Sequence, residues 1–468
     1  RDGGPLTVAR LRLDEIAGIT GGTILQGPPE RSFESYGIDS RRAAPGGLFF
    51  AVRGKRDGHD FVADAAGNGA AGAVIARPVD VADPSFGLVL VGDTVAALQA
   101  LARDVLARRP ARVVGVTGSV GKTTTKEFTA ALLAPRYRVL KSEGNYNNHL
   151  GLALSLLRLG CDDAIAVLEM GMSAPGEIRA LTRIAPPDVA VITNVSPVHL
   201  EFFAGLEEIA LAKREILDGA RPGATAVLNG DDPMVMAVSG GFAGRKVLFG
   251  RSAACDVRAE ALAAKGFDGF EIALRYGRES GRVTLPCLNE ASVADFLAAA
   301  GVCLALGLVL DEIVPVVPAL RPFAMRGAVV ETAGGVRVYD DSYNSNPQAL
   351  EAALASLAGL PAGRKVAVLA DMLELGEGGP DFHRRAGETL AGAGWDVLVA
   401  VGLLAAHIAD GAADAGTPPG AIHRFADAGA AAAAIAGIVR DGDLVLVKGS
   451  RGMRMEAVVE ALRARGME

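Results

Sequence analysis

The sequence predicts an α/β protein of three domains, with a parallel sheet in the central domain and a Rossmann-like α/β domain at the C-terminal end. The chain has 468 residues, more than one hydrophobic core usually holds, so two to four domains are expected. Apolar strands without polar alternation are separated by helical patterns, which indicates parallel sheets buried on both faces. Half of the residues are hydrophobic and few are aromatic, a composition typical of Ala-rich helices covering such sheets.

Changes of pattern along the chain divide it into predicted domains 1–109, 110–322 and 323–468. Pro110 ends a predicted helix and marks the first boundary. The strands expected in the three domains are, in order, 47–52, 72–75, 87–91; 113–116, 164–168, 189–192, 226–228; and a hairpin over 328–339 followed by 365–369, 397–401, 444–447. The expected helices are 94–109, 122–133, 150–159, 177–184, 206–217 and 292–308, with an irregular β-rich stretch over 245–290.

Composition and spacing argue against several classes of protein. The net charge is −7 and no basic run occurs, which argues against a nucleic-acid binder. The four cysteines are far apart, so neither a zinc site nor a disulfide framework is indicated, and a reducing compartment is expected. The longest apolar run, Phe296–Leu310, is too short to span a bilayer. The sequence shows no basic-then-apolar signal segment, and we expect a cytoplasmic protein without membrane contact.

A glycine-rich loop joins a predicted strand, Val113–Thr117, to a predicted helix. Glycines let backbone N–H groups close on phosphate oxygens, and the helix N-terminus adds the positive end of its dipole. Lys122 would reach the β- and γ-phosphates of ATP, and the Thr123 hydroxyl would bind Mg²⁺. The strict motif has glycine where this chain has Val116. The predicted nucleotide contacts are Gly118, Ser119, Val120, Gly121, Lys122, Thr123 and Thr124.

This loop has a simpler interpretation, a strand-to-helix turn with a solvated lysine. Even as a nucleotide site it is compatible with a kinase, a switch-type NTPase or a ligase. Three further residues bear on that choice. Glu169 and His199 follow buried strands, where ligands lie in open α/β sheets, and Lys213 falls within a helix. Singly, these could be a helix-capping Glu, a loop His and a surface Lys.

Taken together, these segments resemble the Mur ligase family. The resemblance rests on 117–126, on Gly144-Asn145-Tyr146-Asn147-Asn148, on 168–171, and on 194–199 with Lys213. It implies that Glu169 and His199 bind Mg²⁺ beside Thr123, that Asn145 belongs to the cofactor site, and that Lys213 is carbamylated at a second metal.

The chemistry of such ligases requires these residue types. ATP and a substrate carboxylate are both anionic, so a lysine and divalent cations are needed to offset their repulsion. The carboxylate takes the γ-phosphoryl group to give an acyl phosphate, and an amine then displaces phosphate to form an amide. The expected catalytic residues are Lys122, His199, Lys213 and Arg326. The base that deprotonates the amine is not identified by the sequence.

Three more segments resemble members of the family that add D-Ala-D-Ala: 339–347, 369–376 with His383, and 445–453. The side-chain amides of Asn344 and Asn346 can donate to the carboxylate of D-Ala-D-Ala, and the resemblance implies that Asp341 binds the ATP ribose. A fourth, in the N-terminal domain, implies binding of a UDP-N-acetylmuramoyl tripeptide, with Ser40, Arg41, His59 and Asp60 as contacts. The Asp-Asn-Pro-Arg segment of the diaminopimelate-adding members is absent. We expect a monomer acting on these small molecules.

Two segments depart from the family pattern. In the stretch 288–295 the His and both Asn of the family's adenine pocket are replaced by other residues, so the adenine contacts are open. Met325 replaces a glycine before Arg326, which keeps the predicted phosphate contact. Another Mur-type or folate-polyglutamylating ligase, or a switch NTPase, remains an alternative. The third residue of the tripeptide, diaminopimelate or lysine, also stays open.

Overall fold

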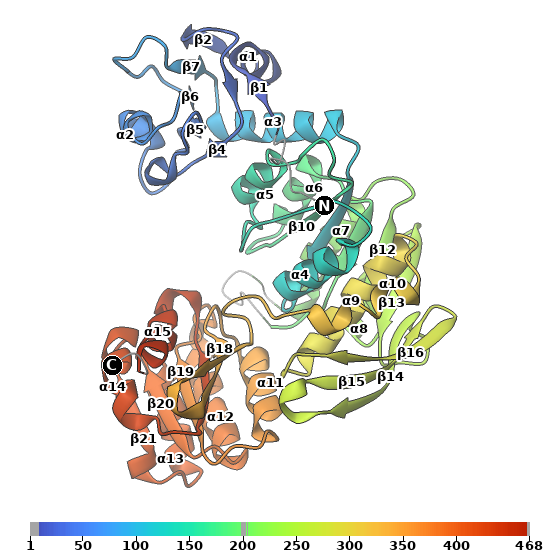
Figure 1. The fold of residues 1–468 in the computed structure, drawn as a ribbon, viewed down its shortest axis with the longest axis vertical. Coiled ribbons are helices and arrows are strands. Elements are labelled where there is room, and N and C mark those ends of the chain that lie inside the picture. Colours follow the sequence, from blue (N-terminus) through green and yellow to red (C-terminus); the bar gives the residue numbers. More distant parts are fainter. Residues whose placement is uncertain (1–8, 198–202, 204, 466–468) are drawn as a thin grey trace.

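A computed structural model describes residues 9–197, 203 and 205–465. Three α/β units follow one another along an elongated molecule (Figure 1). Each is built on its own sheet, of five, nine and six strands in chain order. Among the described residues, no helix is both long and apolar enough to cross a membrane.

The N-terminal sheet has the order β2-β7-β6-β5-β4, in which β4 to β7 are parallel and β2 is antiparallel. The small pair β1-β3 lies beside it. Its strands are β1 Leu11–Arg12, β2 Thr23–Gln26, β3 Ser32–Phe33, β4 Tyr36–Gly37, β5 Leu48–Phe50, β6 Gly72–Ile75 and β7 Gly87–Leu90. Its helices are α1 Leu13–Thr20, α2 Val62–Gly67 and α3 Thr94–Arg108. The Asp93 carboxylate accepts the N–H groups of Val95 and Ala96 and so caps α3.

The central sheet has the order β16-β15-β14-β13-β12-β11-β8-β10-β9. Strands β9 to β14 and β8 are parallel, and β14 to β16 form an antiparallel extension. The strands are β8 Arg112–Thr117, β9 Val139–Lys141, β10 Ile165–Glu169, β11 Val189–Ile192, β12 Thr225–Asn229, β13 Arg245–Gly250, β14 Val257–Ala264, β15 Phe270–Tyr276 and β16 Glu279–Leu285. The helices are α4 Lys122–Leu133, α5 His149–Leu156, α6 Glu177–Ile184, α7 Leu206–Asp218, α8 Pro233–Val238, α9 Ala291–Ala305 and α10 Leu310–Ile313.

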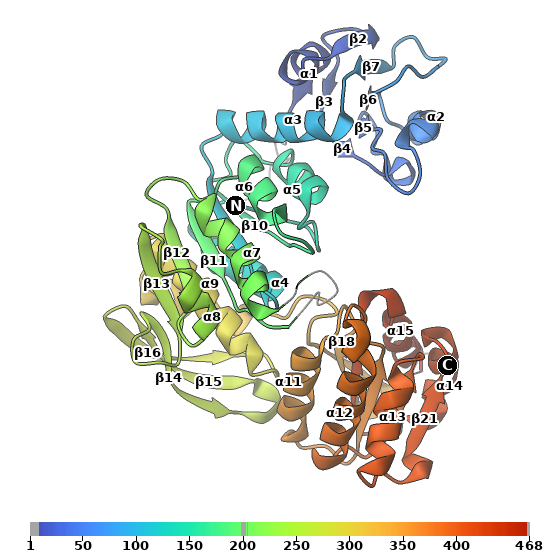
Figure 2. The ribbon, with the colours of Figure 1, turned by 180° about the vertical axis from the view of Figure 1, so that it is seen from behind.

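Helices cover both faces of the central sheet, as the continuous apolar strands predict. Val114 and Val116 of β8 point to the face covered by α4 and α9. Val113, with the opposite orientation, points to the face covered by α5, α6 and α7. The same apolar core continues from α5 and α6 into α3 through Leu98 and Leu101, so the N-terminal unit packs on the central one through this helix (Figure 2).

The C-terminal sheet has the order β17-β18-β22-β19-β20-β21, parallel except for the edge strand β17. Its strands are β17 Ala328–Thr332, β18 Val336–Asp341, β19 Lys365–Ala370, β20 Val397–Val401, β21 Ile422–Phe425 and β22 Leu444–Lys448. Its helices are α11 Pro347–Ala358, α12 Gly379–Gly392, α13 Ala405–Asp414, α14 Ala428–Ile438 and α15 Glu456–Ala464. The mixed α/β class and the parallel sheets expected from the sequence are confirmed.

The C-terminal unit touches the central one near the antiparallel extension and α11 (Figure 1). Leu288 packs into the C-terminal apolar core. The guanidinium of Arg337 lies 4.1 Å from the ring centroid of Phe267. The Ser356 hydroxyl of α11 accepts the N–H of Glu290 at 3.2 Å. These contacts hold the carboxyl ends of the C-terminal strands toward the glycine-rich loop.

Candidate active site

The glycine-rich loop runs from the end of β8 to the start of α4, and two of its positions need glycine. Gly118 has φ +152° and Gly121 has φ +85°. A Cβ atom would lie 1.8 Å from Thr193 Oγ1 at the first position and 2.0 Å from Asp295 Oδ1 at the second. The loop therefore approaches its neighbours so closely that any side chain would displace them.

Residues after β11 hold this loop in shape. The Val120 N–H donates to Asn194 Oδ1 at 2.9 Å, and its carbonyl accepts from Thr193 Oγ1 at 2.6 Å. The Ser119 hydroxyl donates to the Ser196 carbonyl at 3.0 Å. Lys122 Nζ donates to the carbonyls of Gly118 and Ser119. Burial lowers the pKa of Lys122, and the nearby Glu169 carboxylate opposes that shift. The loop is thus ordered with a lysine ammonium beside it.

An oxygen-rich pair stands where β10 ends. Thr123 Oγ1 donates to Glu169 Oε2 at 2.9 Å, and Asn147 Nδ2 donates to Glu169 Oε1 at 2.9 Å. Lys126 Nζ, fully buried, lies 4.0 Å from Glu169 Oε2. A hydroxyl and a carboxylate are oxygen donors of the kind that Mg²⁺ prefers, so Thr123 and Glu169 fit that ion. Asn147 and Lys126 belong to motifs that the sequence singled out, but the sequence assigned them no contact.

Lys213 lies on α7 and is buried. Burial lowers its pKa well below the ordinary value of a lysine, and the charge of Lys122 adds to the effect. A lowered pKa favours the unprotonated amine, the form that carbamate formation requires. His199 lies outside the described residues. No group of three or more His, Cys, Asp or Glu that could hold a metal occurs within the described part of the chain.

Arg326 reaches the loop from the connection to the C-terminal unit. Its guanidinium lies 4.2 Å from the Tyr343 ring centroid and lowers the pKa of Lys122, so the two cations are near neighbours. Met325 has φ +63°, the conformation that favours glycine, which accounts for the glycine that the family pattern has there. The Met325 carbonyl accepts the Tyr343 N–H at 3.1 Å. Tyr343 was not among the predicted site residues, because only the fold brings it to Arg326.

The end of β18 and the loop that follows it carry three predicted residues. Asp341 Oδ2 accepts from Lys448 Nζ at 2.5 Å, and the Asn344 carbonyl accepts from the same ammonium at 3.0 Å. Asn346 Oδ1 accepts the Ala349 N–H at 2.9 Å, so this side chain caps α11. Capping occupies the oxygen of the Asn346 amide and leaves its nitrogen to donate elsewhere. No role was predicted for Lys448 from the sequence, although it lies in the segment 445–453 that resembles the family.

Two cavities adjoin the loop. The smaller, about 120 Å³, lies between the glycine-rich loop and Asp341, and the larger, about 610 Å³, extends to Asn145 and Glu169. Residues that border both cavities are Ser119, Lys122, Arg326, Asn344 and Asn346. The structure therefore places most of the predicted residues of the central and C-terminal units around two adjoining cavities, whereas Lys213 borders neither.

The segment that departs from the family pattern borders the smaller cavity with Asn289, Ala291, Ser292 and Asp295. Asp295 is buried on α9. Burial raises the pKa of its carboxyl group to about 8, and the hydroxyls of Thr125 and Thr124 and the charge of Arg326 oppose the shift. Burial therefore favours the protonated form of this carboxyl group.

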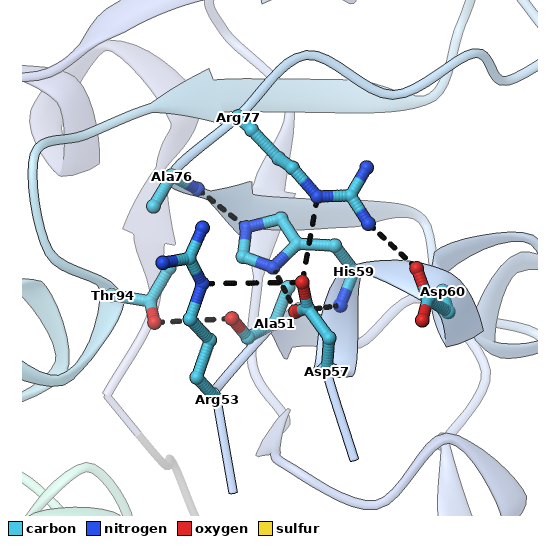
Figure 3. A network of polar contacts seen from close by, with 8 residues as sticks. All are labelled: Ala51, Arg53, Asp57, His59, Asp60, Ala76, Arg77 and Thr94. Atoms are coloured by element: carbon cyan, nitrogen blue, oxygen red, sulfur yellow. Dashed lines mark hydrogen bonds and ion pairs between the residues drawn. The ribbon is translucent and has the colours of Figure 1, made fainter.

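The four predicted residues of the N-terminal unit border neither cavity. Figure 3 shows the His59 ring held from both sides: Nδ1 lies 2.6 Å from Asp57 Oδ1, and Nε2 accepts the Ala76 N–H at 2.7 Å. Asp60 is paired with Arg77 at 2.6 Å. Arg41 is exposed and paired with Asp39, beside the buried Ser40. His59 therefore shapes the loop from inside, and its buried ring has no nitrogen left for a ligand.

A glycine-rich phosphate loop, a neighbouring oxygen-donor pair and two cations between α/β units are what an ATP-dependent amide-bond-forming ligase requires. Known proteins agree with this class. Residues 116–303 match the Mur ligase middle domain, and residues 325–451 match the domain described as Mur ligase, glutamate ligase domain. The chain belongs to the Mur ligase family.

Individual relatives cover nearly the whole chain. The UDP-N-acetylmuramoyl-tripeptide--D-alanyl-D-alanine ligase of Bacillus subtilis is 34% identical over 96% of this chain and 97% of its own. A crystal structure of MurF from Acinetobacter baumannii superposes with a TM-score of 0.88 at 29% identity, covering 98% of this chain and 100% of its own. MurF ligase from Thermotoga maritima in complex with ADP gives 0.79 at 33% identity, covering 92% of this chain and 97% of its own.

Proposed function

We propose that this enzyme joins D-Ala-D-Ala to a UDP-N-acetylmuramoyl tripeptide with ATP, and that it releases ADP, phosphate and the UDP-linked pentapeptide used for peptidoglycan. The observation that carries the proposal is the pair of adjoining cavities that share Lys122, Arg326, Asn344 and Asn346 in their walls. Relatives of that activity, similar over nearly their full length, support it.

The smaller cavity is the ATP site in this proposal. Backbone N–H groups of residues 118–124 bind the phosphates at the N-terminus of α4, and Lys122 lies over the β- and γ-phosphates. Asp341 binds the ribose hydroxyls through the carboxylate oxygen that Lys448 does not use. Asn289 and Ser292 are the side chains available to the adenine, in place of the missing His and Asn.

Thr123 and Glu169 are the residues of the described chain that would hold Mg²⁺, and His199 is proposed with them. Bound Mg²⁺ would offset the negative charges of ATP and of the substrate carboxylate. Lys213 is proposed to be carbamylated, because its buried amine has a lowered pKa. A carbamate would supply a carboxylate-like oxygen pair close to Lys122.

The reaction has two steps. The terminal carboxylate of the tripeptide attacks the γ-phosphorus of ATP, the bond to the β-phosphate oxygen breaks, and ADP leaves. Lys122 and Arg326 stabilise the negative charge that develops on the transferred phosphoryl oxygens. The unprotonated amine of D-Ala-D-Ala then attacks the acyl carbon, phosphate leaves and the amide bond forms.

The larger cavity receives the peptide substrates. The Asn344 and Asn346 amides would donate to the C-terminal carboxylate of D-Ala-D-Ala at its border with the ATP site. The N-terminal unit is proposed to hold the UDP-sugar end, through the exposed neighbours of the His59 network such as Asp60 and Arg41. We propose a monomer that works in the cytoplasm, where ATP and nucleotide-linked precursors are available.

An isotope experiment tests the proposal. The tripeptide substrate is labelled with ¹⁸O in its terminal carboxylate and incubated with ATP and D-Ala-D-Ala. Because that oxygen attacks phosphorus, one labelled oxygen should appear in the released phosphate. Unlabelled phosphate, or equal ATP turnover without tripeptide and amine, would instead identify an NTPase of another class.

A further inference from the structure

Lys448 is the last residue of β22 and stands opposite Asp341 of β18 in the parallel ladder. Only 3% of its side chain is exposed. A buried ammonium is costly unless it is paired and hydrogen-bonded. Lys448 has both kinds of partner, since Nζ donates to Asp341 Oδ2 and to the Asn344 carbonyl.

In the proposed reaction, these two partners of Lys448 contact different substrates: Asp341 contacts ATP, and Asn344 contacts D-Ala-D-Ala. Asp341 borders the ATP cavity only, whereas Asn344 borders both cavities. The ammonium binds a side chain at one end of the loop and a backbone carbonyl three residues later, so it sets the spacing between them. The same strand end holds the loop again, because Ser450 Oγ donates to the Ser345 carbonyl at 3.5 Å and accepts the Leu373 N–H at 2.9 Å.

We propose that Lys448 is a positioning residue shared by the ATP and D-Ala-D-Ala sites, which holds Asp341 for the ribose and the Asn344 segment for the dipeptide. The inference rests on the proposed function. Without Lys448, the Asp341 carboxylate would lose the ammonium that fixes its orientation toward the ribose. The Asn344 carbonyl would lose its donor at the same time, so both substrates should bind less well.

The test compares Lys448→Met with Lys365→Met. Lys365 begins β19 in the same sheet and donates to the Ala358 carbonyl, but it borders neither cavity. Phosphate release is measured with saturating UDP-muramoyl tripeptide while ATP and D-Ala-D-Ala are varied in turn. Lys448→Met should raise both KM values about tenfold or more, and Lys365→Met should leave both within about twofold.

A double mutant separates positioning from general damage. In a Lys448→Met background, Asp341→Asn should raise the KM for ATP much less than it does alone, because the pair is already broken. Independent effects of the two substitutions, a change in one KM only, or equal effects of Lys365→Met would overturn the inference. Should Lys448→Met not fold, Lys448→Arg replaces it, with a smaller rise in both KM values expected.

Failure of the proposed function would look different. A wild-type enzyme that ignores D-Ala-D-Ala overturns that function, and with it the role of Lys448 toward the dipeptide. The claim that Lys448 positions Asp341 for ATP is then tested separately, by measuring the binding of a non-hydrolysable ATP analogue by calorimetry. Unchanged ATP affinity in Lys448→Met would overturn that claim also.

Discussion

The Asp295 carboxyl group is buried on α9, and burial disfavours its ionised form. Its pKa is raised to about 8 in the folded protein, from 3.8, because the carboxyl group is buried. Between about pH 4 and pH 8 the unfolded chain releases this proton while the folded chain keeps it. Raising the pH through that window therefore lowers the free energy of unfolding. Above about pH 8 both states are ionised and this contribution becomes constant.

Asp295→Asn removes the ionisable group with almost no change of shape. We expect the variant to gain thermal stability relative to wild type as the pH rises from 5 to 8. Only wild type loses stability in this range through the buried Asp295 carboxyl group. Melting temperatures measured by circular dichroism at four pH values provide the comparison. Asp311→Asn, at an exposed position on α10, is the control and should track wild type. Parallel curves for Asp295→Asn and wild type would show that Asp295 is ionised when folded.

Lys122 is expected to act on the transition state and to contribute little to packing. Lys122→Ala should lower kcat/KM by about two orders of magnitude or more, since a preorganised contact to developing charge contributes roughly 3 kcal/mol. Its melting temperature should stay near that of wild type. A folded variant with near-normal turnover would exclude the phosphate-loop assignment.

Lys213 offers a chemical test. If it is carbamylated, Lys213→Ala should be nearly inactive and partly restored by a short added carboxylic acid that fits the vacated space. Wild-type activity should also rise with added bicarbonate after degassing. ¹³C NMR with labelled bicarbonate should show a carbamate signal in wild type that is missing from the variant. An identical spectrum for both proteins would remove the carbamate from the account.

At the scale of elements, the sequence was most informative where strands are buried on both faces. Strands β6, β11 and β20 and helices α4 and α6 have the predicted bounds, because continuous apolar runs and helical periodicity need no partner to be identified. Strand β9 escaped prediction because it has three residues at a sheet edge. The stretch 245–290 was expected only as irregular and β-rich, and it contains four strands that extend the central sheet.

The site residues also fall into two groups: those that a local sequence rule identifies and those that only the fold brings together. Residues placed by a local rule, such as Glu169 at a strand end or the loop 118–124 before a helix, could be selected from sequence. Lys448 could not, because its partner Asp341 lies 107 residues away. His59 was selected as a substrate contact by resemblance, and only the structure shows its ring occupied by Asp57 and Ala76.

The Asn346 side chain caps α11 through its oxygen, and its nitrogen is proposed to bind D-Ala-D-Ala. Asn346→Ser keeps a capping oxygen and removes the amide donor. We expect its KM for D-Ala-D-Ala to rise roughly tenfold to a hundredfold, with the KM for ATP and the melting temperature nearly unchanged. Asp341→Ala should show the opposite preference, affecting ATP first. Equal effects of Asn346→Ser on both KM values would argue against the dipeptide contact.

At the scale of the whole molecule, the two junctions differ. The N-terminal unit shares an apolar core with the central unit through α3, so Pro110 marks a change of sheet inside a packed region. The C-terminal unit meets the central one through contacts that include Leu288 and the Arg337–Phe267 pair. In the proposed reaction, the C-terminal unit contributes Asp341, Asn344 and Lys448, which border the same cavity as the phosphate loop. The domain limits 1–109, 110–322 and 323–468 remain a proposal.

The most direct measurement offers the enzyme a choice of amines. Purified enzyme is incubated with ATP, Mg²⁺ and UDP-muramoyl tripeptide, with D-Ala-D-Ala, D-Ala, L-Lys and diaminopimelate in equal amounts, and products are identified by mass spectrometry. The account predicts one main product, the UDP-muramoyl pentapeptide ending in D-Ala-D-Ala, with one ADP formed for each. A parallel reaction with UDP-muramoyl dipeptide should yield almost none. Transfer of L-Lys or diaminopimelate to the dipeptide, with D-Ala-D-Ala left unused, would contradict the account.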